Sequence, residues 1–206
     1  MNKRTLMAAC VAATGGLVLA ACSTFTPPTK EETQAVVKSS FSARSIAKLD
    51  RLEQTEIQAI CSDTRDNPSK EQAAKIEKLA TATIRYPADG KFLGDWKAGE
   101  RVAQSGVGMQ WSDNDKTVNG GNCYACHQID KKEISFGNIG PSLNQYGKLR
   151  GNSEPILKYT WGKIWNSHAF TACSQMPRYG DAKILTEQQI RDVMALLLDP
   201  ASPVNQ

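Results

Sequence analysis

The feature that most constrains this chain is a pentapeptide near its middle, Cys-Tyr-Ala-Cys-His at residues 123–127. Two thiols at this spacing can each form a thioether bond to one porphyrin, and the histidine that follows can then ligate its iron. The Cys-x-x-Cys-His pattern is typical of c-type haem attachment. We therefore expect one covalent haem c, bound through Cys123 and Cys126, with His127 as an axial ligand.

Two other chemistries use similar cysteine pairs. A thioredoxin-like redox pair also has Cys-x-x-Cys, but it expects a βαβ context that the pattern of this sequence does not indicate. A zinc site needs two further ligands at suitable spacing, and His168 and Cys173 could supply them. The zinc alternative stays open at this level, although the haem interpretation is favoured.

The N-terminus has the layout of an export signal. Lys3 and Arg4 precede an apolar stretch over residues 6–21, which ends in Leu-Ala-Ala-Cys. This ending resembles the bacterial lipobox, which implies removal of residues 1–21 and a lipid on Cys22. A lipid would tether the protein to a membrane in the periplasm. Ordinary cleavage would instead leave Cys22 as a plain thiol on a soluble periplasmic protein.

The remaining cysteines suggest a disulfide. Of the six in the chain, Cys10 leaves with the signal, Cys22 is assigned to the lipid and two are assigned to haem. Cys61 and Cys173 are left as a pair in an oxidising compartment, where disulfides persist. We expect a bond between them, and the alternative is two buried free thiols.

Three segments follow the signal. Residues 22–35 are rich in proline, threonine and charge, which predicts a tether. Residues 36–86 are expected to form a small helical extension, with one helical face running from Ile46 to Ile60 and a second helix that starts at a Ser69–Gln72 capping box. Residues 87–206 form the main domain.

The main domain is predicted to be mainly α-helical. Asp95 is expected to cap a helix in which Gly99 permits a close helix crossing. The last helix starts at a capping box formed by Thr186 and Gln189. Its apolar residues recur at the spacing of one helical face; they are Ile190, Val193, Met194, Leu197 and Leu198.

The iron also needs its sixth position filled or left open. The candidate ligands are Met109, His168 and Met176, and His168 is expected to be a surface or packed histidine and not a ligand. Trp161 and Trp165 are expected to wall the haem pocket.

Met176-Pro177, shortly before the final helix, resembles the class I cytochrome c family, in which a Met-Pro loop supplies the second axial ligand. The resemblance implies a class I cytochrome c-like domain, with the terminal helix packed on the N-terminal one and Met176 on the iron. Gly-Pro-Ser-Leu at residues 140–143 matches a segment whose proline carbonyl, here that of Pro141, accepts the ring N–H of His127.

Four segments together resemble the SoxX monohaem cytochrome subunit; they are residues 120–128, 138–143, 173–180 and 190–200. The resemblance implies a complex with a SoxA-type cytochrome subunit that joins thiosulfate to a cysteine of a SoxYZ-type carrier protein. The bond-forming chemistry belongs to the SoxA-type partner. The chain is then the electron-accepting subunit of an L-cysteine S-thiosulfotransferase, not catalytic alone, and it passes electrons to a downstream acceptor.

Two rival functions stay open. A free-standing monohaem cytochrome c would shuttle electrons between periplasmic respiratory partners, although the extension at residues 36–86 favours a complex. A haem sensor or gas-binding module would need an open or weakly ligated iron. A nucleic-acid partner is not expected, because the net charge of +4 is too small for such a footprint.

Overall fold

The structure is a computed structural model that describes residues 26–206. The expected signal peptide at residues 1–21 and the expected lipid attachment at Cys22 lie outside the described residues. The described residues fall into two units, with the division between Ser42 and Ala43. Between residues 26 and 206 the structure contains helices, turns and one isolated bridge but no β-strand, which confirms the mainly α prediction.

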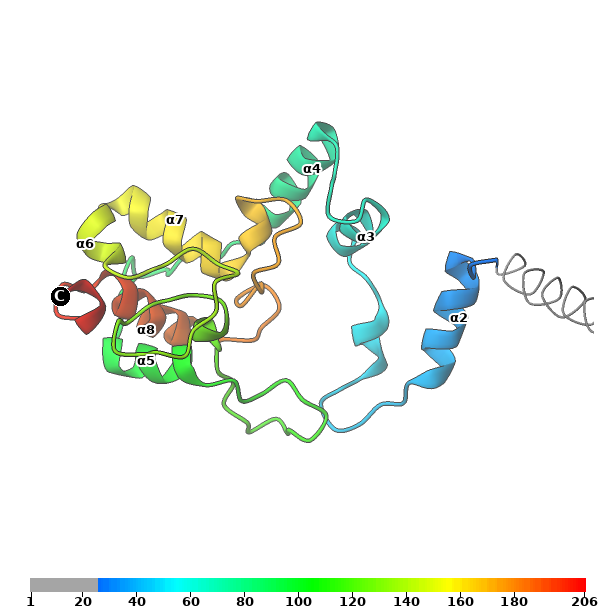
Figure 1. Cartoon of the computed structure of the whole chain (residues 1–206), viewed down its shortest axis with the longest axis horizontal. Coiled ribbons are helices and arrows are strands. Elements are labelled where there is room, and N and C mark those ends of the chain that lie inside the picture. Colours follow the sequence, from blue (N-terminus) through cyan, green and yellow to red (C-terminus); the bar gives the residue numbers. More distant parts are fainter. Residues whose placement is uncertain (1–25) are drawn as a thin grey trace, which may run out of the picture. The chain divides into compact units, whose positions relative to one another are not determined.

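The helical elements follow one another along the chain in Figure 1. The α-helices are α2 (Lys30–Ser40), α3 (Glu56–Asp63), α4 (Lys70–Thr81), α5 (Trp96–Gln104), α6 (Tyr146–Arg150), α7 (Glu154–Trp165) and α8 (Glu187–Leu198). Short 3-10 turns are η1 (Leu49–Leu52), η2 (Cys123–Ala125), η3 (Ser167–Ala169) and η4 (Pro203–Asn205). None of the helices described is long and apolar enough to cross a membrane.

Helix α2 lies in the first unit and crosses the expected boundary between tether and extension at residue 35. It begins after Thr29, which forms a capping box with Glu32, and none of its residues is buried. The tether prediction rested on the lack of burial, and that lack is present. It missed the helix because a capping box and acidic first-turn residues favour a helix start without any packing.

The continuous helical face expected from Ile46 to Ile60 is wrong in its first half. Residues 49–52 form only the turn η1, and α3 starts at Glu56. The start is set by Thr55, whose side chain accepts from the Gln58 N–H while Gln58 accepts from the Thr55 N–H. A reciprocal cap of this kind defines a new helix N-terminus, whatever apolar spacing precedes it.

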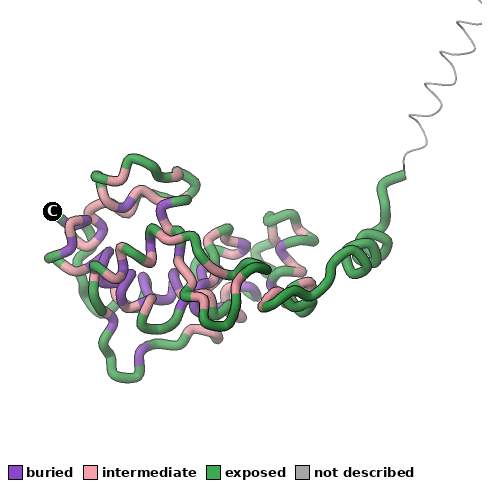
Figure 2. The backbone as a smooth tube through the Cα atoms, turned by 90° about the horizontal axis from the view of Figure 1, so that it is seen from below, coloured by how far each residue is buried: buried purple, intermediate pink, exposed green. Residues whose placement is uncertain are grey.

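Helices α3 and α4 enclose a small core of their own. Its buried members are Ile57, Cys61, Ile76, Ala80 and Cys173, the last of which comes from the far end of the chain. Helix α4 starts at the predicted Ser69–Gln72 capping box. This small core is separate from the main core. Figure 2 marks the buried residues in purple along the backbone.

The main core forms where α5 crosses α8, the green and red helices of Figure 1. A Cβ added to Gly99 would lie 2.0 Å from the backbone oxygen of Asp192, so only glycine allows this approach. The Asp95 cap and the Thr186–Gln189 capping box are both present. The predicted helix crossing at Gly99 is therefore confirmed, and α8 is buried along most of its length.

Candidate haem site

The Cys-x-x-Cys-His segment forms a tight turn at η2. Asn122 has a positive φ of 47°, and the backbone N–H groups of Cys126 and His127 both donate to the Cys123 carbonyl. These bonds turn the chain so that both cysteines and the histidine border the same cavity. The hydrogen bonds within the turn thus bring the two thiols and the imidazole to one cavity.

The loop at residues 137–143 is held alongside this turn by backbone hydrogen bonds. Gly137 donates to Tyr124, Gly140 to Cys126 and Leu143 to Gln128, at 2.8, 2.8 and 2.7 Å. A Cβ on Gly140 would lie 2.2 Å from the Cε1 atom of the His127 ring. Glycine at this position therefore lets the loop backbone lie directly against the imidazole.

The His127 ring is oriented by the proline next to that glycine. Its Nδ1 atom lies 2.7 Å from the carbonyl oxygen of Pro141, which places the ring proton on Nδ1. The other ring nitrogen, Nε2, is then left with a lone pair for a metal. The contact between His127 and Pro141 that the cytochrome c resemblance implies is thus present.

Met176 borders the same cavity from a different loop, between η3 and α8. Its backbone is fixed on both sides by serine hydroxyls: Ser167 donates to the Met176 carbonyl at 2.6 Å, and the Met176 N–H donates to Ser174 at 3.3 Å. The side chain is partly buried and packs against the main core. Met109, the other candidate methionine, also borders the cavity.

The cavity has a volume of about 850 Å³, in the upper part of the roughly 300–1,000 Å³ range of ligand sites. Its walls away from the cysteines are largely apolar and include Ile129, Leu143, Ile164, Val193 and Leu197. A large apolar cavity bordered by two thiols, an oriented imidazole and a thioether fits a covalently attached haem c. Cys123 and Cys126 would hold its porphyrin, with His127 and Met176 available to its iron.

The cysteine environment argues against the two alternative chemistries. Burial raises the pKa of the Cys123 thiol to about 12, whereas a thioredoxin-like nucleophile needs a lowered pKa. The candidate zinc ligands do not assemble, because Cys173 is bonded to Cys61 and His168 does not border the cavity. Neither alternative is therefore supported by the residues around the two thiols.

Two aromatic side chains are not where the sequence placed them. Trp161 and Trp165 were expected to wall the pocket, but neither borders the cavity, so that prediction is wrong. Their indole N–H groups donate to the carbonyls of Arg85 and Thr83, at 2.7 and 2.9 Å. The reason is their position on α7: they face the segment that precedes the main domain, a packing relation that helical spacing alone does not reveal.

His168 is a packed histidine, one of the two alternatives that the sequence left open for it. It is 8% exposed, and its Nδ1 atom is buried without a hydrogen-bond partner. Burial, assisted by the charge of Arg178, lowers the pKa of this imidazole, so it stays neutral.

Sequence reasoning missed three residues of the site. Tyr179 is buried and its hydroxyl donates to the Gly121 carbonyl, which ties the methionine loop to the haem-binding turn; burial raises the pKa of this phenol. Ser167 holds the Met176 carbonyl, and Lys163 borders the cavity while donating to Thr171. Of these, Tyr179 carried a signal, since a tyrosine three residues after the methionine lies inside the matching segment 173–180.

The fold and the site together define a c-type cytochrome domain. The family described as cytochrome c matches residues 112–199, which include the haem-binding turn, Pro141, Met176 and all of α8. The chain therefore contains a cytochrome c domain, whose family binds haem c covalently and transfers electrons.

A relative of known sequence is similar over a longer region. It is a protein of Aquifex aeolicus (strain VF5) described as an uncharacterized lipoprotein, 39% identical over 145 residues. The aligned region covers 68% of this chain and 66% of the relative, just under two thirds of its length.

Proposed function

We propose that this chain is the electron-accepting subunit of a SoxXA-type complex, with one haem c. The observation that carries electron transfer is the single cavity bordered by Cys123, Cys126, His127 and Met176. The narrower role is supported by the four segments that resemble SoxX, which include both ligand regions and the C-terminal helix. In this role the chain is not catalytic alone.

Bound haem c supplies a one-electron couple at its iron, and a histidine–methionine ligand pair raises its reduction potential. The residues of the chain prepare the site for that task. His127 is held through its Nδ1 atom by Pro141, Met176 is fixed by Ser167, and the apolar walls keep water away. With His127 and Met176 both available to the iron, the group would transfer electrons without binding substrate at the metal.

In the proposed reaction, a carrier-protein thiol and thiosulfate form a sulfur–sulfur bond and release one proton and two electrons. The bond forms on the SoxA-type partner, and a chain with one haem accepts the electrons one at a time and passes each to a downstream acceptor. The test is co-purification of the tagged chain from thiosulfate-grown cells. We expect a second c-type cytochrome in the eluate and thiosulfate-dependent haem reduction when carrier protein is added. A tagged chain that elutes alone, and is reduced equally well without the carrier protein, supports the free-standing carrier instead.

We also propose that Cys22 carries a lipid that holds the domain at a membrane in the periplasm. Two observations support this: the Leu-Ala-Ala-Cys sequence that ends at residue 22, and the description of the Aquifex relative as a lipoprotein. Cell fractionation tests it, with Cys22→Ser as the variant and Cys10→Ser as the matched control. We expect Cys10→Ser to stay in the membrane fraction with an acylated N-terminal peptide and Cys22→Ser to lose that peptide. An unmodified Cys22 thiol in the wild-type protein overturns the proposal.

A further inference from the structure

The loop that carries Met176 has little regular structure of its own, yet it is attached to a part of the chain outside the cytochrome c match. This part is residues 56–86, which we call the α3–α4 segment. The loop runs from η3 to α8, and its contacts with the α3–α4 segment are of three kinds: one covalent bond, one hydrogen bond and a shared apolar core.

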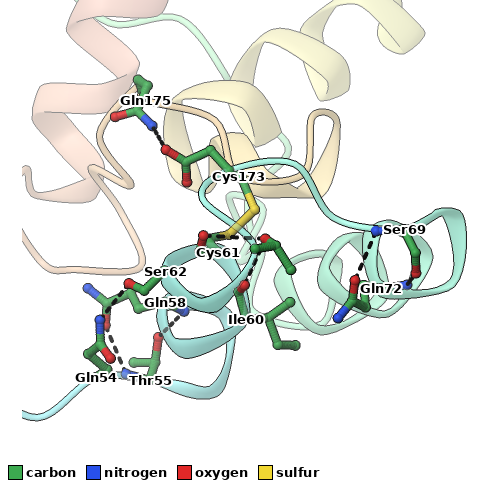
Figure 3. The surroundings of a disulfide bond; sticks show 12 residues. Gln54, Thr55, Gln58, Ile60, Cys61, Ser62, Ser69, Gln72, Cys173 and Gln175 are labelled. Carbon is green, nitrogen blue, oxygen red and sulfur yellow. Dashed lines mark hydrogen bonds between the residues drawn. A yellow bond between two sulfur atoms is a disulfide. The ribbon is translucent and has the colours of Figure 1, made fainter. Parts of the chain in front are cut away.

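The covalent bond lies three residues before the methionine. Cys61 in α3 is joined to Cys173 by a disulfide across a sequence separation of 112 residues (Figure 3). Cys173 itself has a positive φ of 55°, and its sulfur is buried in the small core with Ile76 and Ala80. Gln175, the residue directly before Met176, donates to the carboxylate of Asp66 at 2.8 Å. The segment is therefore attached to the loop at Cys173 and at Gln175, both within three residues of the methionine.

The α3–α4 segment is in turn attached to the end of α7, just before η3 and the methionine loop. The indole of Trp165 donates to the Thr83 carbonyl, and the amide of Asn166 donates to the Thr83 hydroxyl at 3.0 Å. Helix α4 also packs directly on η3, which contains Ser167, the residue that donates to the Met176 carbonyl. The segment thus contacts the start of the loop as well as Cys173 and Gln175 within it.

We propose that the α3–α4 segment is a positioning element for Met176, which keeps its loop closed over the iron so that other ligands cannot replace the methionine. This inference rests on the proposed role of Met176 as the axial ligand. The disulfide is its main attachment, and Trp165 is a second attachment that does not depend on the disulfide.

The physical basis is a competition between closed and open loops. An external ligand such as imidazole can bind ferric iron only when Met176 has moved away, so its apparent affinity scales with the fraction of open loops. A cross-link restricts the conformations that the two segments it joins can adopt when they are apart. The disulfide should therefore disfavour conformations in which the methionine loop has moved away from the α3–α4 segment. Its removal should raise the open fraction, and the apparent affinity for imidazole should rise by the same factor.

The experiment is a titration of the full-length ferric holoprotein with imidazole, followed by the absorption spectrum. The test variant is the double substitution Cys61→Ser/Cys173→Ser, which leaves no unpaired thiol. We expect it to bind imidazole at least tenfold more tightly than the wild type while keeping its covalent haem. A second variant, Trp165→Phe, loses the indole donor to Thr83 with the disulfide intact, and we expect a smaller change in the same direction.

The matched control is Ser202→Ala. The Ser202 hydroxyl is fully buried and donates to the Leu196 carbonyl near the C-terminus, so its loss lowers stability without touching the methionine loop. We expect a lower melting temperature for Ser202→Ala but an imidazole affinity within twofold of wild type. If this control binds imidazole as tightly as the disulfide variant, general instability explains the effect and the positioning role is wrong.

The outcomes separate this inference from the function on which it rests. If Met176→Ala changes the spectrum but both test variants keep wild-type imidazole affinity, the methionine is the ligand and the positioning role fails. If Met176→Ala leaves the spectrum and the imidazole affinity unchanged, the ligand assignment itself fails. Should the disulfide variant not mature, Trp165→Phe decides alone, and an unchanged affinity there overturns the proposal.

Discussion

The two sides of the haem cavity are built in different ways. On the side of His127, the ring is fixed by Pro141, 14 residues away, and by backbone bonds between the haem-binding turn and the loop that follows it. On the side of Met176, a local bond from Ser167 is supplemented by attachments that reach back 83 to 112 residues, to Thr83, Asp66 and Cys61.

The His127 ring is thus held mainly by residues close to it in the sequence. Met176 depends in addition on residues that are distant in the sequence. Short-range contacts form whenever the local turn forms, because little chain entropy is lost in closing them. Long-range contacts depend on the α3–α4 segment being in place. We therefore expect damage on the His127 side to affect haem retention and iron ligation directly, and damage on the Met176 side to affect exchange of the sixth ligand.

The largest expected effect is on the haem-binding turn. Replacing both thiols, as Cys123→Ser/Cys126→Ser, removes the two groups that can form thioether bonds. We expect no covalent haem in the variant, measured as the loss of the haem mass from the intact protein expressed in a host with cytochrome maturation machinery. The matched control is Cys61→Ser/Cys173→Ser, which should keep the haem mass. A haem mass that survives in the first variant would show that the attachment site lies elsewhere.

The next largest effect concerns the two methionines that border the cavity. Met176→Ala should remove the axial thioether and lower the reduction potential by at least about 100 mV, a fraction of the roughly 0.8 V that axial ligands set. It should also abolish the weak long-wavelength band of ferric iron with a methionine ligand. Met109→Ala is the matched control and should change neither. If the two variants exchange these results, Met109 is the ligand and the comparison between the two sides must be redrawn.

On the His127 side, Gly140→Ala tests how tightly the ring is held. The new Cβ would lie 2.2 Å from the ring, so the imidazole must move and its bond to Pro141 must weaken. Changes to groups that orient a metal ligand cost about 10–100-fold in metal affinity or activity. We expect covalent haem to remain but part of the iron to become high-spin, seen in the absorption spectrum. A fully low-spin spectrum would mean that the loop shifts without disturbing the ring.

The same contrast explains what the sequence could predict. The haem-binding turn, Pro141, the capping boxes and the crossing at Gly99 each depend on residues close in sequence or on a resemblance carried by short segments. The positions of Trp161 and Trp165 depend on which element faces α7, and periodicity does not specify the partner of a helical face. The start of α3 was missed because apolar spacing was given more weight than the Thr55 cap.

The role of residues 36–86 also changes with the structure. As a sequence feature, the extension favoured a complex over a free-standing carrier, because a simple carrier has no evident need for it. The structure gives most of this region an internal partner, the loop of Met176. The extension is therefore explained without a partner protein, and co-purification becomes the deciding observation between the two functions.

A smaller effect is expected from the local bond on the Met176 side. Ser167→Ala removes the hydroxyl that donates to the Met176 carbonyl at 2.6 Å. A hydrogen bond of this kind contributes about 1 kcal/mol, which corresponds to roughly fivefold in an equilibrium. We expect imidazole affinity to rise by about that factor, less than for the disulfide variant. If imidazole affinity rises more in Ser167→Ala than in the disulfide variant, the local bond restrains the loop more than the disulfide does, and the proposed order is wrong.

The smallest effect is expected at a site that belongs to neither side of the cavity. Arg191 on α8 donates to both carboxylate oxygens of Asp89, at 2.9 and 3.0 Å. These bonds, together with one that the Lys91 N–H donates to the same carboxylate, lower the Asp89 pKa from 3.8 to about 2. Because the folded-state pKa is the lower one, the pair stabilises the protein fully above pH 3.8 and progressively less as the pH falls through 2.

Asp89→Asn should therefore lower the melting temperature slightly at neutral pH, by an amount that shrinks toward zero as the pH approaches 2. The Asp89 side chain is exposed to solvent, so high salt should reduce the difference as well. Imidazole affinity and reduction potential should equal those of the wild type, because Asp89 does not border the cavity. A shift in either quantity would show that α8 transmits changes at its N-terminal end to the iron, and that the two sides of the cavity are coupled through the core and not held separately.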